Sequence, residues 1–252
     1  MPTTESFVDL FSEGAGHYAV ARPTYPDALF DFVAARAPLR RRAWDCGTGN
    51  GQAAVSLATR FDAVAATDPS AEQIRHAAPV SNIAYSVQPA EHTDFPDGSF
   101  DAICVAQALH WFSIDEFFRE ARRVAVPGAL LAAWGYSWFS VTPEFDAAFD
   151  RAILQPVERH WAPNNRLLWN GYAEIAFPFD RLATPDFTMT MNWTLPQLLA
   201  YVGTWSAVRR CAATDGPGFL QAAAGELAAC WGSAEAARPV IMPLHLVAGL
   251  LP

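Results

Sequence analysis

The stretch Asp45-Cys-Gly47-Thr-Gly49-Asn-Gly51 decides the fold, because it joins two segments of different periodicity. It begins within the last two residues of the apolar run at 43–46 and precedes a helical stretch at 52–60. Glycines at this spacing let the backbone turn tightly and approach a ligand closely. The first turn of the following helix presents N–H groups that have no partner within the helix. The pattern therefore predicts a ligand-binding turn between a buried strand and a helix.

Around this turn, short apolar runs alternate with helical stretches, which is the pattern of βαβ units and a parallel sheet. Five strands are expected at residues 43–46, 63–67, 83–87, 101–106 and 129–134, with helices at 52–60, 70–77 and 114–124. Period-2 alternation at 187–193 and an apolar run at 240–250 add two more strands, and helices are expected at 196–210 and 218–231. The fold class predicted is α/β, doubly wound and Rossmann-like, with a predominantly parallel seven-stranded sheet and helical N-terminal and C-terminal cap elements.

The domain organisation expected has three parts. Residues 1–40 form an N-terminal helical cap segment, in which the helical stretch 7–37 is interrupted by two prolines at 22–26. Residues 41–136 form the Rossmann-like core. Residues 137–252 combine a cap insertion rich in Trp, Pro and Asn with C-terminal helices and the strands that close the sheet.

An acidic residue ends the second expected strand. Asp68 follows the glycine turn by about 20 positions, where a carboxylate in an open α/β sheet accepts both hydroxyls of a ribose. Turn and carboxylate together predict a cofactor that contains adenosine, bound at the point where the strand order reverses.

The register of the glycines selects among such cofactors. Residues 49–54 formally satisfy the dinucleotide pattern GxGxxA, but the glycine that adjoins the strand is Gly47. Counted from Gly47, the pattern requires a small residue at position 52, and this chain has the larger Gln52 there. The strand also ends in Asp45, a carboxylate that would repel a pyrophosphate and suits a cationic ligand. S-adenosylmethionine carries a sulfonium and an ammonium group and no phosphate.

The basic residues exclude several classes of enzyme. The 252-residue chain has 17 Arg plus Lys, all of them arginine. Without an ε-amine there is no Schiff base, no phosphate-loop or kinase-type lysine, and no Tyr/Lys dehydrogenase pair. A net charge of −9 disfavours a nucleic-acid partner, since binding to a phosphate backbone is chiefly electrostatic. Any fixed cation for an acidic ligand must be an arginine or a protonated histidine.

Neither a metal site nor a membrane segment is expected. The cysteines, Cys46, Cys104, Cys211 and Cys230, form no CxxC, and the histidines form no HxxxH pair. The N-terminus lacks the features of a signal peptide, and no apolar run reaches membrane-spanning length. We therefore expect a cytoplasmic protein, and the sequence leaves its oligomeric state open.

The ordered set DCGTGNG, ATDPS and PAEHTDFPDGSFDAICVAQALHWF resembles a class I S-adenosylmethionine-dependent methyltransferase. The subgroup it most resembles includes the trans-aconitate methyltransferases and related small-molecule enzymes, which share a YxxxRPxYP element and an ALHWF element. Here these elements lie at residues 18–26 and 108–112, and the resemblance covers residues 11–136.

The resemblance implies which residues surround the cofactor. The glycine turn would enclose its methionine part, Asp68 its ribose, and Ala90 and Glu91 its adenine. Many relatives have an Asp before that Ala-Glu pair, whereas this chain has Pro89, so the backbone of Ala90 would substitute for it. The cofactor-binding residues implied are Asp45, Gly47, Thr48, Gly49, Gly51, Asp68, Pro69, Ala90, Glu91 and Gln107.

A second group of residues is expected at the acceptor or at the cofactor carboxylate. Tyr18 and Arg22 lie one helical turn apart, so both can face one pocket. If the acceptor is a carboxylate it needs no base, and Arg22, or else Arg209 or Arg210, would orient it. If it is a hydroxyl or an amine, His110 is the expected catalytic base. The pocket residues expected are Phe11, Tyr18, Arg22, His110, Trp111 and Trp134.

The sequence thus predicts in-line transfer of a methyl group from S-adenosylmethionine to a small-molecule acceptor, for which a carboxylic acid is one hypothesis. Two alternatives stay open at this point. One is a nicotinamide-dependent (NAD(P)) oxidoreductase, and the other is an S-adenosylmethionine-binding regulator or partner subunit without catalysis.

Overall fold

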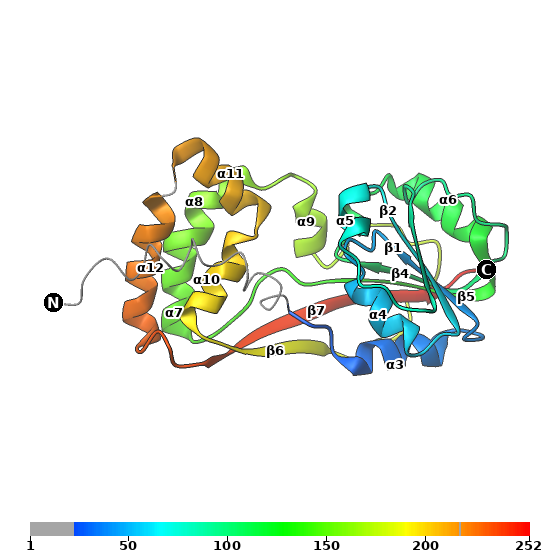
Figure 1. Cartoon of the computed structure of the whole chain (residues 1–252), viewed down its shortest axis with the longest axis horizontal. Helices are drawn as coiled ribbons and strands as arrows, with labels where there is room; N and C mark the ends of the chain where they lie inside the picture. The colour runs from blue at the N-terminus through cyan, green and yellow to red at the C-terminus, as the bar shows by residue number, and fades with distance from the viewer. Residues whose placement is uncertain (1–22, 217) are drawn as a thin grey trace. The chain divides into compact units, whose positions relative to one another are not determined.

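A computed structural model describes residues 23–216 and 218–252 of the chain, which divides into two compact units (Figure 1). The core unit consists of Thr24–Ser137, Asn164–Thr188 and Pro243–Pro252. The helical unit contains Trp138–Pro163 and Met189–Met242.

A seven-stranded sheet has the strand order β3-β2-β1-β4-β5-β7-β6. The strands are β1 (Arg42–Cys46), β2 (Ala63–Asp68), β3 (Ile83–Val87), β4 (Phe100–Ala106), β5 (Ala125–Gly135), β6 (Phe187–Trp193) and β7 (Arg238–Leu250). The chain builds outward from β1 to β3 on one side and then from β4 to β5 on the other. The order therefore reverses between β1 and β4, which is where ligands bind in open α/β sheets.

The sheet is mixed, so the expectation of a predominantly parallel sheet is only partly correct. Strands β1 to β5 pair in parallel, but β7 runs antiparallel to β5, with Gly135 opposite His245 and Leu130 opposite Leu250. The chain leaves the sheet at the end of β5 and re-enters it at that same end. A parallel partner would have required a crossover to the opposite end.

Helices cover both faces of the core sheet (Figure 1). On one face lie α3 (Asp27–Arg36) and α4 (Gln52–Ala58), and on the other lies α6 (Ile114–Val124). Strands β1, β2, β4 and most of β5 are buried, as expected for a parallel sheet covered on both sides, whereas β3 at the sheet edge is partly exposed. On the α6 face, Trp44 packs against Phe100 and Phe117. Neighbouring β1 residues point to opposite faces, so Asp45 points away from this cluster.

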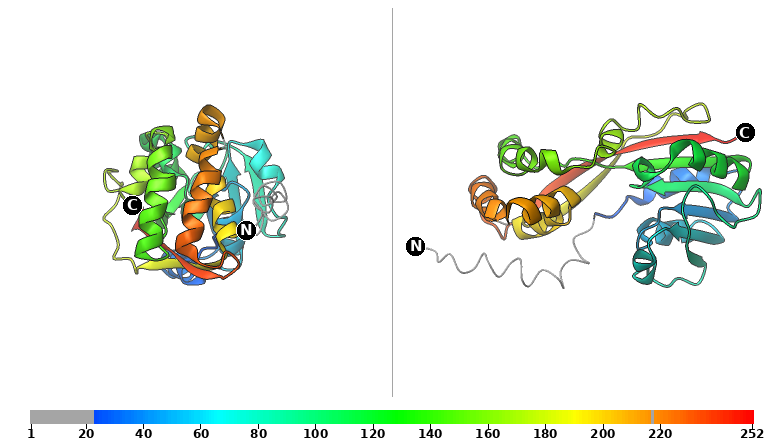
Figure 2. Two further views of the ribbon diagram at one scale, coloured as in Figure 1. Left: turned by 90° about the vertical axis from the view of Figure 1, so that its left-hand side faces the viewer. Right: turned by 90° about the horizontal axis from the view of Figure 1, so that it is seen from above.

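Further helices belong to each unit. The core unit also contains α5 (Ala71–Arg75), the 3₁₀ turn η1 (Leu109–Trp111) and α9 (Asn165–Trp169). The helical unit contains α7 (Pro143–Phe149), η2 (Asp150–Leu154), α8 (Gln155–Val157), η3 (Glu158–His160), α10 (Leu195–Gly203), α11 (Ser206–Asp215) and α12 (Gly218–Trp231). Helices α7 and α12 pack side by side, as Figure 2 shows.

The helical unit is held together by an aromatic cluster around Trp205. The Trp205 ring lies 5.8 to 6.2 Å from the rings of five other aromatic side chains, which are Trp138, Phe139, Phe149, Trp161 and Tyr201. Trp205 adopts an extended conformation between α10 and α11. The single helix expected at 196–210 is therefore wrong: the chain breaks there, which places the indole among the other rings.

Within the described residues, no helix combines the length and the apolar character that crossing a membrane would need.

Candidate cofactor and acceptor site

The glycine turn lies at the carboxyl end of β1 and requires glycine conformations. Gly47, Gly49 and Gly51 have φ angles of 72°, 57° and 87°, in the left-handed region that favours glycine. The backbone N–H groups of Gly47 and Thr48 both donate to the carbonyl of Thr67, at 2.9 Å each. These bonds attach the turn to the end of β2, so the first two strand ends form one rigid edge.

Close packing restricts two of these glycines further. A Cβ atom on Gly47 would lie 2.6 Å from the Cβ of Ala108, which follows β4. A Cβ atom on Gly51 would overlap the ring and hydroxyl of Tyr85, which lies on β3. The turn is thus packed between the β4 side and the β3 side of the sheet.

Asp45 is a fully buried carboxylate. Its Oδ2 accepts a 2.5 Å hydrogen bond from the Thr48 hydroxyl, while Oδ1 has no hydrogen-bond partner among the residues that the structure describes. Burial raises the pKa of Asp45 from 3.8 to about 6, against the opposing effects of the Thr48 hydrogen bond and of the nearby Ala54 backbone N–H. A cationic group beside Oδ1 would supply both the missing partner and the missing charge.

Asp68 is held rigidly at the end of β2. One carboxylate oxygen accepts from the backbone N–H of Gly49 and the other from that of Ser70, at 2.9 Å each. Each carboxylate oxygen has a second acceptor site left for a further donor. The structure therefore brings Asp68 directly to the glycine turn, with a fixed orientation.

The residues that follow β3 lie close to the start of α6. Ala90 is buried, and the Glu91 carboxylate accepts a 2.9 Å hydrogen bond from the backbone N–H of Ser113, just before α6. Pro69, in contrast, is exposed at the end of β2. Contacts within the fold thus already engage Glu91, and its role toward adenine stays a prediction.

Gln107 joins the ends of β4 and β5. Its side-chain amide donates to the carbonyl of Tyr136 and accepts from the backbone N–H of the same residue, at 3.0 Å each. Its φ angle is 57°, an unusual conformation for a residue other than glycine. The paired contacts offset this strain and fix the backbone where the sheet carries the site.

His110 and Trp111 belong to η1, which begins three residues after the end of β4, and they differ in exposure. The Trp111 side chain is 52% exposed, whereas His110 is only 4% exposed. Burial lowers the pKa of His110 to about 4, so the imidazole is neutral at pH 7. Its Nδ1 atom has no hydrogen-bond partner among the described residues. A neutral ring with an unused nitrogen can take or share a proton.

The remaining residues of the expected acceptor pocket divide into two groups. Trp134 is fully buried on β5, in edge-to-face contact with Tyr25 and Phe30. Phe11, Tyr18 and Arg22 lie outside the described residues. The roles predicted for all four remain predictions.

Tyr85 is a site residue that the sequence did not indicate. Its ring covers Gly51, and its hydroxyl is buried without a hydrogen-bond partner among the described residues. Burial raises the pKa of Tyr85, and the nearby Asp45 charge raises it further. The only sequence signal was a tyrosine in the middle of an apolar strand.

The fold and this geometry define a class of protein. A glycine turn, a rigid carboxylate at the end of β2 and a buried carboxylate lie where the strand order reverses, and one oxygen of the buried carboxylate has no partner among the described residues. This arrangement suits a nucleoside cofactor that carries a positive charge rather than a pyrophosphate.

Comparisons with known proteins identify the family. The family described as "Methyltransferase domain" matches residues 44–133. A candidate methyltransferase of Dictyostelium discoideum is 31% identical over 210 residues, covering 82% of this chain and 80% of the relative. An uncharacterized methyltransferase of Mycobacterium tuberculosis H37Rv is 35% identical over 197 residues, covering 71% and 78% of the two chains.

A solved structure extends the likeness beyond the core. The structure of a candidate type II methyltransferase from Anaeromyxobacter dehalogenans superposes with a TM-score of 0.86 at 41% identity, covering 91% of this chain and 98% of that one. The chain belongs to the S-adenosylmethionine-dependent methyltransferases, and S-adenosylmethionine is its expected cofactor. This result selects the methyltransferase prediction over the nicotinamide-dependent alternative.

Proposed function

We propose that the protein methylates a small molecule whose acceptor atom gives up a proton, such as a hydroxyl or an amine. The observation that carries this proposal is His110, a buried and neutral imidazole whose Nδ1 has no hydrogen-bond partner among the described residues. It lies two residues beyond Ala108, which packs against Gly47 of the glycine turn. The net charge of −9 argues against a nucleic-acid acceptor.

The chain's own residues would divide the work as follows. Asp45 and the glycine turn bind and orient the cofactor, and Asp68 fixes its ribose. S-adenosylmethionine supplies a methyl group that its sulfonium already activates, so the protein mainly positions and desolvates the reactants. His110 accepts the acceptor's proton as the new bond forms in line with the departing thioether. We further propose that the segments outside 41–136 select the acceptor.

A carboxylic acid is the second hypothesis for the acceptor. It rests on the resemblance of the Tyr18 to Pro26 element to that of the trans-aconitate methyltransferases, and on the spacing of Tyr18 and Arg22. A carboxylate is ionised at pH 7 and needs no base, so His110 would then have no proton to accept.

A methyl-transfer assay on a cell extract tests the small-molecule proposal. Labelled S-adenosylmethionine, the purified protein and the extract are incubated, and the labelled products are identified by mass spectrometry after ultrafiltration. We expect a labelled metabolite in the filtrate. Label confined to macromolecules would contradict the proposal, and the absence of any transfer would favour a regulator without catalysis.

His110→Gln then separates the two acceptor classes. With a hydroxyl or amine acceptor, we expect kcat to fall by about 10²- to 10⁴-fold, the usual contribution of a general base. The wild-type rate should rise as the pH passes upward through about 4, where the buried His110 loses its proton, and the variant should lack this step. His76→Gln, at the exposed C-terminal end of α5, is the matched control. An unchanged kcat in folded His110→Gln would instead support a carboxylate acceptor.

A further inference from the structure

A polar cluster in the helical unit takes no part in the site described above. It consists of His160 at the end of η3 and of Cys211 and Asp215 on α11. Cys211 and Asp215 are four residues apart, so they lie on the same face of that helix. Cys211 is buried, His160 is largely buried and Asp215 is partly exposed, which places the cluster just beneath the surface.

The three side chains bring together one nitrogen, one sulfur and one oxygen. All three ligand-type atoms lie within 4.8 Å of one another. Oδ2 of Asp215 is 3.2 Å from Nε2 of His160 and 3.6 Å from Sγ of Cys211. With the usual bond lengths, a tetrahedral zinc ion separates a nitrogen and an oxygen ligand by about 3.3 Å, and a sulfur and an oxygen ligand by about 3.6 Å. The observed spacing therefore matches two edges of a zinc tetrahedron.

Hydrogen bonding alone does not satisfy this cluster. Nε of Arg159 lies 3.2 Å from Nε2 of His160, and the same Nε2 atom lies 3.2 Å from Asp215. If Nε2 accepts from Arg159, it carries no proton that it could donate to the carboxylate of Asp215. If Nε2 carries the proton, it faces the N–H group of Arg159. In either tautomer of His160, its contact with Arg159 or its contact with Asp215 is therefore unfavourable. A cation between the nitrogen, sulfur and oxygen atoms would interact favourably with all three of these atoms.

We propose that His160, Cys211 and Asp215 bind a zinc ion. Mixed nitrogen, sulfur and oxygen ligands are typical of zinc, while magnesium and calcium prefer oxygen alone. Binding would form a Zn–S bond and break the S–H bond of Cys211, whose proton passes to solvent. The ion would also join η3 to α11 within the helical unit.

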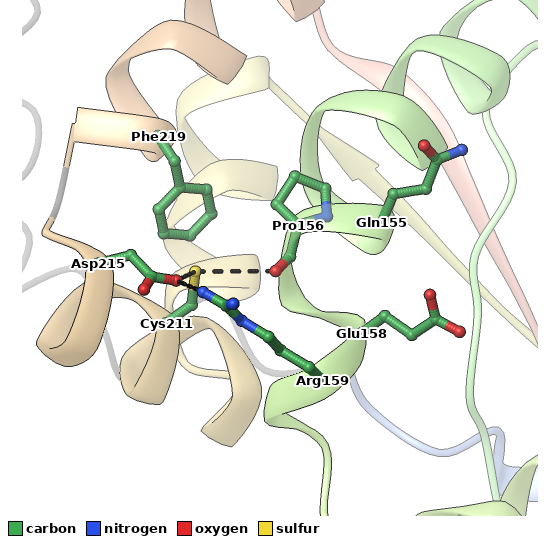
Figure 3. Close-up of a pocket in the computed structure, with 7 residues that line it drawn as sticks. All are labelled: Gln155, Pro156, Glu158, Arg159, Cys211, Asp215 and Phe219. Atoms are coloured by element: carbon green, nitrogen blue, oxygen red, sulfur yellow. Dashed lines mark hydrogen bonds and ion pairs between the residues drawn. The ribbon is translucent and has the colours of Figure 1, made fainter.

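Room exists for a fourth ligand and for the displacement of Arg159. Cys211, Asp215 and Arg159 line a cavity of about 410 Å³ together with Gln155, Pro156, Glu158 and Phe219 (Figure 3). Nη2 of Arg159 lies 2.6 Å from Oδ2 of Asp215, so the guanidinium group occupies the position at the carboxylate that the zinc ion would take. Its side chain is 70% exposed, and exposed ion pairs contribute little to stability. A divalent ion can therefore displace it, and a water molecule can complete the tetrahedron.

Titration of the metal-free full-length chain tests the proposal. Zinc is added in competition with a chromophoric chelator, and cobalt is added separately as a spectroscopic substitute. We expect one equivalent of metal per chain and a cobalt–thiolate absorption band. Cys211→Ser should abolish the band, and both Cys211→Ser and Asp215→Asn should weaken zinc binding tenfold or more. Cys230→Ser, a partly buried cysteine of the same unit, is the matched control and should bind like the wild type.

Arg159→Gln distinguishes a metal site from a hydrogen-bonded cluster. Removing the competing guanidinium should tighten zinc binding several-fold, whereas a cluster that serves only to hold Arg159 would gain nothing. Circular dichroism of each metal-free variant checks that it is folded. The proposal is overturned if the wild type shows no saturable binding, or if Cys211→Ser binds cobalt with an unchanged spectrum.

Discussion

The core unit and the helical unit each contain a notable aspartate, and their surroundings are opposite. Asp45 is buried at the end of β1, one of its carboxylate oxygens has no partner in the part of the chain that the structure describes, and burial raises its pKa to about 6. Asp215 lies near the surface of α11, where contacts from Arg159, His160 and Cys211 lower its pKa, the Arg159 hydrogen bond most of all. Among the described residues, no cation lies beside the first carboxylate, whereas Arg159 already pairs with the second. The contrast shows that burial can raise the pKa of an aspartate in one unit while paired side chains lower that of an aspartate in the other.

The two units also differ in how they are held together. In the core unit, regular strand pairing fixes the backbone, and the polar residues of the site lie where strands end. In the helical unit, aromatic side chains from distant parts of the chain meet around Trp205. We therefore expect the helical unit to depend on single large side chains.

Trp205→Ala should have the largest effect on stability. The side chain is 9% exposed and lies against five other rings, so its truncation should lower the free energy of unfolding by about 3–5 kcal/mol. Denaturant unfolding followed by circular dichroism measures this loss. Trp138→Ala, at a position that is 36% exposed, is the matched control and should cost less. Equal losses would contradict the dependence on Trp205.

The same difference explains what the sequence could predict. Two strands and two helices were predicted with the observed bounds. The strands are residues 83–87 and 187–193, and the helices are residues 114–124 and 218–231. For these elements, the hydrophobic periodicity and the breaks at either end were enough to predict the type and the bounds of the element. The glycine turn after the first strand was also predicted, and its positive φ angles are those that such a turn requires.

What could not be predicted depends on contacts between distant residues. The break in the helix at Trp205 arises from aromatic packing with side chains far away in sequence. The antiparallel β7 reflects where the chain re-enters the sheet, and the contact of Tyr85 with Gly51 depends on the placement of β3. The cluster of His160, Cys211 and Asp215 joins positions about fifty residues apart, and the sequence has no CxxC or HxxxH spacing that would have predicted it.

Asp45→Asn should have two effects of opposite sign. Loss of the negative charge should weaken S-adenosylmethionine binding by about 10- to 100-fold, the usual value of a charged hydrogen bond. The variant without cofactor should be more stable at pH 7.5, by up to about 3 kcal/mol, because it no longer buries a charge. Calorimetric titration and denaturant unfolding measure the two effects. Asp62→Asn, at an exposed position after α4, is the control and should change neither.

The pH dependence gives a further check on Asp45. Because the folded pKa is raised above the unfolded value, the folded state holds this proton more tightly. The contribution of Asp45 to stability is therefore most favourable below about pH 4 and is lost as the pH rises through about 6. Cofactor affinity should follow the reverse course and increase over the same range, because the ionised form attracts a cation. Asp45→Asn should lack both trends, and a variant that kept them would assign them to another group.

Gly51→Ala should have a smaller effect, and it isolates the close packing of the glycine turn. The substitution combines a left-handed φ of 87° with overlap between the new methyl group and Tyr85. Gly98→Ala is the matched control, since Gly98 has a φ of 61° and no atom of the described residues lies within 4 Å of the added Cβ. Backbone strain of this kind costs about 1–3 kcal/mol in either variant, so any excess loss in Gly51→Ala measures the overlap alone.

The excess should be about 1–2 kcal/mol, a typical cost of overpacking. It should vanish when Tyr85→Ala is added, because removal of the ring leaves space for the methyl group. Denaturant unfolding of the single and double variants gives the coupling between the two residues directly. An excess that survives the removal of Tyr85 would mean that the turn excludes a side chain for another reason. If the excess vanishes, Tyr85 on β3, which no motif indicated, adds a second requirement for glycine at position 51 beyond the left-handed φ angle.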